Sequence, residues 1–196
     1  MNAFIGDYLR TDDEWEELVW VWRQTDVPKG CRVEVVEGLI TVAHYSANAH
    51  HTIASCVQRS LYDVISKNWG VHQRLTMADP SRLGLYVPDL AVVPEEPPRS
   101  GDDSFVLAAA AELVVEITSK ATADNDRGKK AAGYAWAGIP LYLLIDSLAP
   151  GGPTITLYGE PKEGVYRVLR AGRFGDAVFL PEPFDVDLGT SEFPMC

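Results

Sequence analysis

The chain has 196 residues, of which 46% are hydrophobic and 23% charged, and we expect residues 1–196 to form one domain with a substantial core. No apolar run approaches about 18 residues, so we expect no membrane span, and acids stand where a secretion signal has basic residues. The net charge of −11 counts against a general nucleic-acid-binding protein, which usually carries a basic face. The cysteines Cys31, Cys56 and Cys196 have neither zinc nor disulfide spacing, which fits a cytoplasmic protein.

Helical and strand periodicities alternate along the chain. Thr11 followed by acidic residues predicts the start of a helix over 11–23, and "RVEVVEGLITVAHY" predicts a hairpin over 32–45 that turns at Glu37-Gly38. The remaining predicted elements, in chain order, are a helix over 47–67, strands at 70–77 and 85–93, a loop over 94–103, a strand over 113–120, a helix over 124–137, a strand over 141–146, and short strands at 154–158, 164–169 and 176–180. This order predicts an α/β fold: a mixed β-sheet flanked by helices, with an added N-terminal helix and hairpin.

Two carboxylates interrupt apolar strands. Glu116 stands inside "LVVEITSK", and Asp89 stands inside "YVPDLAVV". A buried carboxylate needs a partner or a changed protonation state. Pro88 cannot donate within a central ladder, so it predicts a bulge or an edge position, although Pro88-Asp89 could also simply start a turn. We expect the two carboxylates to converge and, in the absence of metal, to raise each other's pKa.

The helix after the second acid carries a lysine. Asp126, Lys130 and Tyr134 follow one another at intervals of four, so they share a helix face that can point toward Glu116. Taken alone, the spacing is explained better by an ordinary ion pair between Asp126 and Lys130, four residues apart on the helix.

Two further polar residues precede these. Strand alternation places Glu34 on the face opposite Val33 and Val35, although an exposed hairpin glutamate is the simpler interpretation. His50 lies on the same side of its predicted helix as Ile53, and a capping or surface histidine explains it as well.

Carboxylates beside a lysine point to metal chemistry. Carboxylate oxygens suit Mg²⁺ or Mn²⁺, and such an ion both activates water and offsets charge on a phosphoryl group. A lysine nearby can orient or deprotonate the attacking water, or stabilise the developing charge.

The chain resembles the putative restriction endonuclease family that is common in cyanobacteria and actinobacteria and belongs to the PD-(D/E)XK nuclease superfamily. The resemblance runs from about Asp7 to Leu188 and is carried by "VEVVEGLITV", "YVPDLAVV", "LVVEITSKATADNDRGKKAAGYAWAGIPLYLLID" and "FDVDL". It implies a restriction-endonuclease-like core in which acids on adjacent strands bind Mg²⁺ or Mn²⁺.

The resemblance also assigns expected roles. Asp89 matches the first metal-binding acid and Glu116 the second, while Glu34 and His50 match an upstream acid and histidine. The usual lysine two residues after the second acid is replaced by Thr118.

The missing lysine has two possible replacements. Lys130 matches a lysine that this family carries on the following helix, where Asp126 and Tyr134 also match recurrent positions. Relatives usually read Ser-Pro-Ser-Thr where this chain has Ser119-Lys120-Ala121-Thr122, so Lys120 is a rival for the role.

The resemblance implies an endonuclease that hydrolyses DNA phosphodiester bonds with Mg²⁺ or Mn²⁺. The alternative is a non-catalytic nuclease-fold module with a structural or nucleic-acid-binding role, and fold alone does not decide between them. Sugar hydrolysis by paired carboxylates is a weaker third reading, because it would not require Lys130. Trp15, Trp20 and Trp22 offer more aromatic surface than one short helix usually buries, and symmetric dimers are the commonest oligomers, so we also expect a homodimer.

Overall fold

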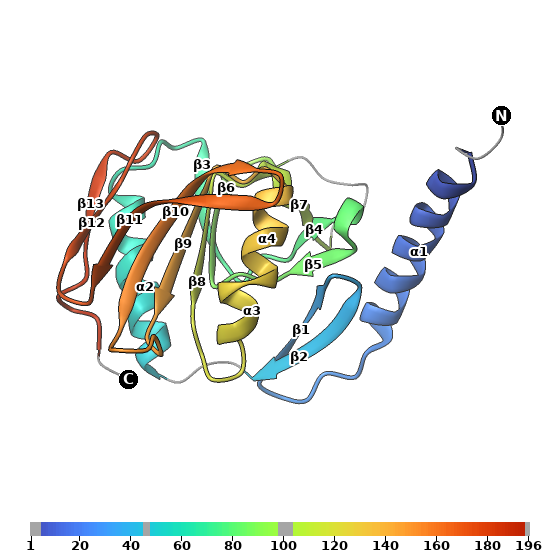
Figure 1. Ribbon diagram of the computed structural model, residues 1–196, viewed down its shortest axis with the longest axis horizontal. Helices are drawn as coiled ribbons and strands as arrows, with labels where there is room; N and C mark the ends of the chain where they lie inside the picture. The colour runs from blue at the N-terminus through green and yellow to red at the C-terminus, as the bar shows by residue number, and fades with distance from the viewer. Residues whose placement is uncertain (1–4, 45–47, 98–103, 195–196) are drawn as a thin grey trace.

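A six-stranded mixed sheet forms the centre of the molecule in the computed structural model, which describes residues 5–44, 48–97 and 104–194 and the side chains from residue 13 on (Figure 1). The strands of this main sheet, in spatial order, are β11 (Val165–Arg173), β10 (Thr154–Lys162), β9 (Leu141–Asp146), β8 (Leu113–Ile117), β6 (Leu90–Pro94) and β3 (Trp69–Gln73). The β8–β9 pair is parallel and its neighbours pair antiparallel, so the sheet is mixed.

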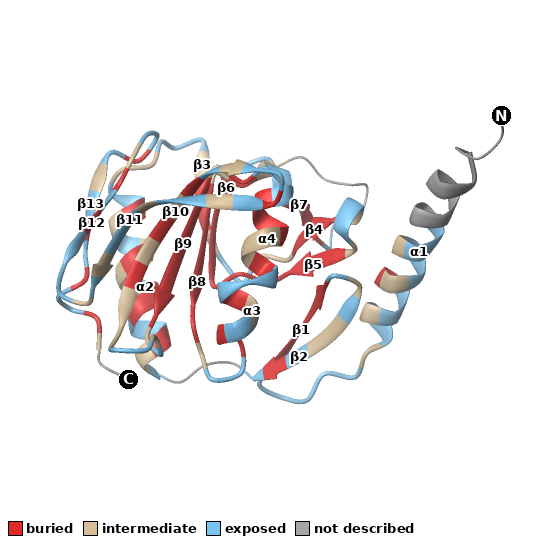
Figure 2. Ribbon diagram, viewed as in Figure 1, coloured by how far each residue is buried: buried red, intermediate tan, exposed pale blue. Residues whose placement is uncertain are grey.

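Helices cover both faces of the main sheet. The first face packs against α2 (Asn48–Tyr62) and includes Leu113, Val115 and Ile117 of β8. The other face lies beneath α3 (Ala123–Arg127) and α4 (Lys129–Trp136), with Val114 in its core. Because side chains of a strand alternate between faces, Glu116 points toward α4. Figure 2 shows the buried strands between these helices.

A second, five-stranded sheet lies beside the first. Its strands, in spatial order, are β2 (Leu39–His44), β1 (Cys31–Val36), β5 (Gly84–Tyr86), β4 (Met77–Asp79) and β7 (Val106–Leu107). The N-terminal helix α1 (Ile5–Gln24) packs Val19 against Val35 and Leu85 of this sheet. The remaining elements are the 3₁₀ turns η1 (Pro80–Arg82) and η2 (Ala108–Ala110) and a two-stranded sheet of β12 (Ala177–Leu180) and β13 (Val186–Gly189).

The β1–β2 hairpin turns where the sequence predicted it. Val36 pairs with Leu39, and the two residues between them, Glu37 and Gly38, both have positive φ, 52° and 74°. Two consecutive positive φ values characterise the two-residue turn whose twist matches that of antiparallel strands. This turn fixes the register in which β1 presents Glu34.

Two predicted strands are each divided between the two sheets. The strand predicted over 70–77 is β3 in the main sheet and the start of β4 in the second, and the one predicted over 85–93 is β5 and β6. The second division falls at Val87-Pro88-Asp89, where Pro88 cannot donate to a ladder. Asp89 therefore lies where the chain crosses from one sheet to the other, which corrects the prediction of continuous strands.

Helix boundaries also differ from the predictions. The first helix begins at Ile5, so Thr11 is inside it and does not cap it, and the helix predicted over 47–67 ends at Tyr62. The helix predicted over 124–137 is broken at Gly128, whose φ of −126° and ψ of −87° are not helical. Parts of three predicted elements lie outside the described residues. They are residue 45 at the end of the hairpin, residue 47 at the start of the second helix, and most of the 94–103 loop.

The predicted class is confirmed as an α/β fold with a mixed sheet flanked by helices. Among the helices of the described residues, none combines the length and apolar composition needed to cross a bilayer.

Candidate active site

Glu116 is fully buried on β8, beneath α4. Its Oε1 accepts a hydrogen bond from Tyr134 Oη at 2.6 Å and lies 2.5 Å from Lys130 Nζ. Its Oε2 is buried and has no hydrogen-bond partner among the described residues. Burial raises the pKa of Glu116 well above its usual value, and the charges of Asp126 and Asp89 add to the effect against the opposing charge of Lys130. One oxygen of this carboxylate is therefore bonded, and the other is buried without a partner among the described residues.

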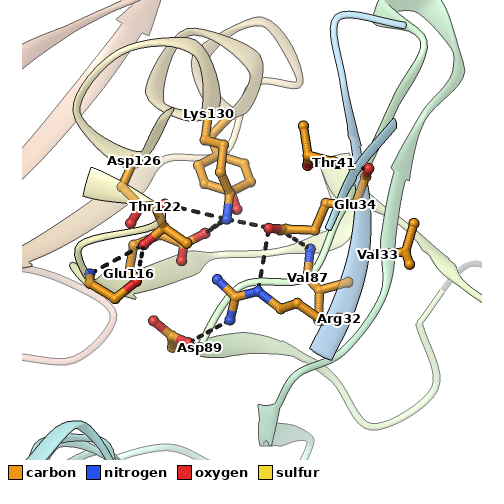
Figure 3. Close-up of polar contacts among 12 residues, drawn as sticks. Arg32, Val33, Glu34, Thr41, Val87, Asp89, Glu116, Thr122, Asp126 and Lys130 are labelled. Atoms are coloured by element: carbon orange, nitrogen blue, oxygen red, sulfur yellow. Dashed lines mark hydrogen bonds and ion pairs between the residues drawn. The ribbon is translucent and has the colours of Figure 1, made fainter. Parts of the chain in front are cut away.

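Lys130 connects the main sheet to the second sheet. Its Nζ lies 2.9 Å from Glu34 Oε1 and 3.5 Å from Asp126 Oδ1, in addition to its contact with Glu116, as Figure 3 shows. Burial alone would lower the pKa of Lys130, but the neighbouring carboxylates outweigh it and raise that pKa above its ordinary value. Lys130 is therefore a permanently protonated donor.

Glu34 reaches this lysine from β1 and is only 4% exposed, which corrects the interpretation of an exposed hairpin glutamate. Its Oε1 accepts a hydrogen bond of 2.8 Å from the backbone N–H of Val87. Burial opposes ionisation, but Lys130 and Arg32 outweigh it and lower the pKa of Glu34. Glu34 is thus a stably ionised partner for the lysine.

Asp89 is held by three donors. Arg32 Nη1 lies 3.0 Å from Oδ1, while His50 Nε2 and the backbone N–H of Ile117 lie 3.0 and 2.8 Å from Oδ2. Burial would raise the pKa of Asp89, but the His50 hydrogen bond and the Arg32 charge outweigh it and lower the pKa to about 2. The expectation that Asp89 and Glu116 raise each other's pKa therefore holds for Glu116 and is wrong for Asp89, because these donors stabilise its charged form.

His50 is buried on α2, not on the surface. It shares the buried face of that helix with Ile53 and Val57 and is 8% exposed. Its Nδ1 is also buried and has no hydrogen-bond partner in the described parts of the chain. The helix thus orients the ring toward Asp89 from the side of the main sheet opposite Lys130.

Arg32 is the residue that sequence reasoning missed. It is 7% exposed, and its guanidinium bridges Asp89 and Glu34, with Nε 3.3 Å from Glu34 Oε2. Its presence is encoded in β1, because Arg32 and Glu34 are two residues apart in an otherwise apolar strand and must share a face. A charged pair at this spacing was the available signal.

Asp126 and Tyr134 complete the lysine's surroundings. Both are fully buried, and burial raises the pKa of each, which the Glu116 charge reinforces at Tyr134. The break at Gly128 does not separate them, because α3 and α4 both lie against the Glu116 face of the sheet. The expected ion pair between Asp126 and Lys130 is present at 3.5 Å, but it is buried and the lysine also contacts Glu34 and Glu116.

The two lysines that compete for the site differ in position. Lys120 is exposed, beyond the end of β8 at Ile117, whereas Lys130 is 1% exposed and contacts Glu116. The geometry thus brings Lys130 to the second acid.

The buried charged cluster has more negative than positive charge. Its members are Arg32, Glu34, His50, Asp89, Glu116, Asp126 and Lys130, and all are buried. With His50 neutral, four carboxylates face two cationic side chains, so full ionisation leaves two negative charges uncompensated. Because unpaired buried charge is costly, protons or a divalent cation must supply the balance.

The donor atoms fit Mg²⁺ or Mn²⁺. An ionised carboxylate offers about four lone pairs. Asp89 uses three of its lone pairs, and within the described part of the chain Glu116 Oε2 has no hydrogen-bond partner. No group of three or more His, Cys, Asp or Glu side chains in the described part of the chain is arranged to hold one ion. Mg²⁺ typically takes only one or two carboxylates plus water and phosphate oxygens, so two acids suffice.

Comparisons with known proteins identify the fold and the family of the chain. No curated protein matches the chain. A crystal structure described as a putative nuclease belonging to DUF820, from Anabaena variabilis, superposes with a TM-score of 0.65 over 88% of this chain and 94% of that one. At 19% identity, this similarity shows the fold alone. A family model described as Uma2, putative restriction endonuclease, matches residues 15–191, which is most of the chain. The chain therefore belongs to the Uma2 family of putative restriction endonucleases.

Proposed function

We propose that this chain is a divalent-metal-dependent endonuclease that hydrolyses phosphodiester bonds of DNA. The observation that carries the proposal is the position of Lys130, which lies within 2.9 Å of both Glu116 and Glu34, beside a carboxylate oxygen that has no hydrogen-bond partner among the described residues. A structural ion pair needs one acid, whereas this lysine is buried among three carboxylates that exceed the available positive charge.

Asp89 and Glu116 would hold Mg²⁺ or Mn²⁺. Such an ion, when bound, supplies a lowered pKa for its water and offsets negative charge on a phosphoryl group. The protein's contribution is to orient both carboxylates and to keep Asp89 ionised. Arg32 and His50 hold Asp89, and Tyr134 fixes Oε1 of Glu116.

Lys130 acts as a hydrogen-bond donor in this proposal. Its raised pKa keeps it protonated, so it orients the attacking water or stabilises charge on a phosphoryl oxygen and does not accept the water's proton. Glu34, with its lowered pKa, stays ionised and holds Lys130 Nζ in place. Asp126 contacts the same ammonium group from α3.

The direct experiment is DNA cleavage by the purified protein. Supercoiled plasmid and single-stranded circular DNA are incubated with Mg²⁺, Mn²⁺ or EDTA. The proposal expects nicked or linear products with the metals and intact substrate with EDTA. Intact DNA in every metal lane would contradict it.

The alternative, a non-catalytic nuclease-fold module, is favoured by one observation. Glu116 and Lys130 are closed off from solvent, and both oxygens of Asp89 are already bonded. In such a module the cluster would serve stability alone. DNA binding without metal-dependent cleavage is the result that would select this alternative.

We also propose a homodimer and a cytoplasmic location. Trp20 is 63% exposed on α1, although Trp15 packs edge-on against Phe105 at 6.0 Å between ring centres. An exposed tryptophan is a common anchor of protein interfaces. Light scattering across a dilution series tests the first point, with a monomer mass throughout contradicting it, and cell fractionation tests the second.

A further inference from the structure

A pocket of about 450 Å³ lies between the C-terminal end of α1 and β1. It is lined by arginines from three separate segments: Arg23 of α1, Arg32 of β1 and Arg74 of the loop between β3 and β4. We call it the arginine pocket. Among the described residues that line it, there is no Asp or Glu. Three arginines thus converge on one pocket of a chain whose net charge is −11.

The other lining residues suit a nucleotide chain. Thr25 and Thr76 add hydroxyl groups, and the half-buried Trp22 adds an aromatic ring. Trp22 Nε1 donates to the carbonyl of Val33 at 3.2 Å, which fixes the orientation of the ring. Arginine forks pair with phosphate oxygens, and aromatic rings stack on bases, so the pocket contains both types of group that bind nucleic acids.

The arginine pocket adjoins the buried charged cluster through two shared residues. Arg32 lines the pocket and also bonds Asp89 Oδ1 at 3.0 Å. Val87 lines the pocket, and its backbone N–H donates to Glu34. Arg32 thus stands between the pocket and the carboxylates, where it screens an approaching phosphate from their negative charge. Arg23 and Arg74 are both exposed.

Arg74 occupies an unusual backbone conformation. Its φ is 55°, a left-handed value that arginine adopts less readily than asparagine or glycine. A turn alone would be served better by either of those residues. This left-handed turn thus carries an arginine that lines the pocket.

We propose that the arginine pocket binds a phosphate group of the nucleic-acid backbone and so guides the substrate to Asp89 and Glu116. This inference rests on the proposed function for the identity of the substrate. It also resolves the conflict between an acidic chain and an anionic substrate, because the nucleic acid approaches on this face.

The test measures binding without cleavage. A fluorescein-labelled DNA duplex is titrated with the protein in EDTA, and fluorescence anisotropy is followed from low to moderate salt. Each phosphate contact on a duplex contributes about 0.9 to the slope of log K against log salt concentration. Arg74→Asn should therefore reduce the slope by about one, Arg23→Gln together with Arg74→Asn by about two, and Arg74→Lys by little.

Arg170→Asn is the matched control. Arg170 is exposed on β11, at the far edge of the main sheet, and its replacement changes the net charge by the same amount. Because asparagine tolerates a left-handed φ, Arg74→Asn should melt at the wild-type temperature. A wild-type slope in Arg74→Asn, an equal loss in Arg170→Asn, or no binding of DNA by the wild type would each overturn the inference.

The result separates the two proposals. A reduced slope in Arg74→Asn with no plasmid cleavage in Mn²⁺ supports the pocket and rejects the endonuclease. Cleavage that proceeds unchanged in the Arg23 and Arg74 double variant, with an unchanged salt slope, rejects the pocket and leaves the endonuclease standing.

Discussion

Lys130 Nζ lies 2.5 Å from Glu116 Oε1, and both side chains are closed off from solvent. The lysine comes from α4 and the glutamate from β8, so the pair fixes the helix over the strand at this point. Each group makes the burial of the other tolerable, since either one alone would be an uncompensated buried charge.

Lys130→Met should destabilise the protein strongly. Removing one partner of a buried pair costs about 3–5 kcal/mol, because the remaining charge is left unpaired. Glu116 can then take up a proton, so the loss should be smaller at about pH 5 than at pH 8. Urea unfolding at both pH values measures the free energy. Lys129→Met is the matched control, because Lys129 is half exposed and pairs with Glu37 at the surface, where ion pairs contribute about 1 kcal/mol or less. Equal losses in the two variants would contradict this account.

Arg32→Gln should move acid unfolding of the metal-free protein to higher pH. The folded-state pKa of Asp89 is about 2, below its ordinary value, so its ionised form stabilises the fold above about pH 4. That stability is lost as pH falls through about 2. Removing Arg32 raises the folded pKa and thereby weakens the fold at neutral pH. Far-ultraviolet circular dichroism along an acid titration checks this prediction, and an acid midpoint equal to that of Arg170→Gln would refute it.

Glu116→Gln should flatten the pH dependence of apo stability. The pKa of Glu116 is raised in the folded state, so stability falls as pH climbs above the ordinary carboxyl value, roughly 4, and through the folded pKa. Glutamine has no charge to bury and therefore removes this dependence. Melting temperatures in EDTA from about pH 5 to pH 8 measure it. An unaltered slope would show that Glu116 is already fully compensated.

The same variant should respond less to metal. A ligand that binds only the folded protein stabilises it by RT ln(1 + [L]/Kd), about 2.7 kcal/mol at a concentration of 100 Kd. Mn²⁺ should raise the melting temperature of the wild type and raise that of Glu116→Gln much less. Equal shifts in both proteins would place the metal away from Glu116.

Gly133→Ala should disturb the aromatic support of the site. A Cβ atom at this position of α4 would overlap Tyr86 Oη, and Tyr86 packs edge-on against Tyr134 at 5.1 Å between ring centres. Overpacking of this kind costs about 1–3 kcal/mol. Gly133→Ala together with Tyr86→Phe removes the hydroxyl in the way and should recover part of the loss. Thermal unfolding measures both variants, and a neutral single substitution would mean that Tyr86 can move aside.

The sequence predicted those features that depend on local periodicity. The strand at 141–146 has the predicted bounds, and the Glu37-Gly38 turn is confirmed, because alternation and turn chemistry are read from neighbouring residues. The division of the 85–93 segment between two sheets was not predicted, since it depends on pairing with distant strands. The single domain expected over residues 1–196 stays a prediction. A single cooperative unfolding transition would support it.

The candidate site was predicted in part. The convergence of Lys130 on Glu116 followed from helix spacing and from the resemblance to known nucleases. Burial of Glu34 and His50 was not foreseen, because it depends on Lys130 and Asp89 approaching from other elements. Arg32 was missed for the same reason: its two partners, Glu34 and Asp89, come from different strands, and only the fold brings them together.

Glu116 is the residue on which the proposed active site depends, and one comparison tests its role most directly. Wild type, Glu116→Gln and Glu112→Gln, purified in parallel and shown to be folded, are incubated with supercoiled plasmid and Mn²⁺. Glu112 is a half-buried acid beside the start of the same strand, so Glu112→Gln controls for the general effect of this substitution. We predict nicking by the wild type and by Glu112→Gln, and a loss of at least about a hundredfold in Glu116→Gln, the size expected when a key electrostatic group is removed. Nicking by Glu116→Gln at the wild-type rate would contradict the assignment of this cluster as the active site.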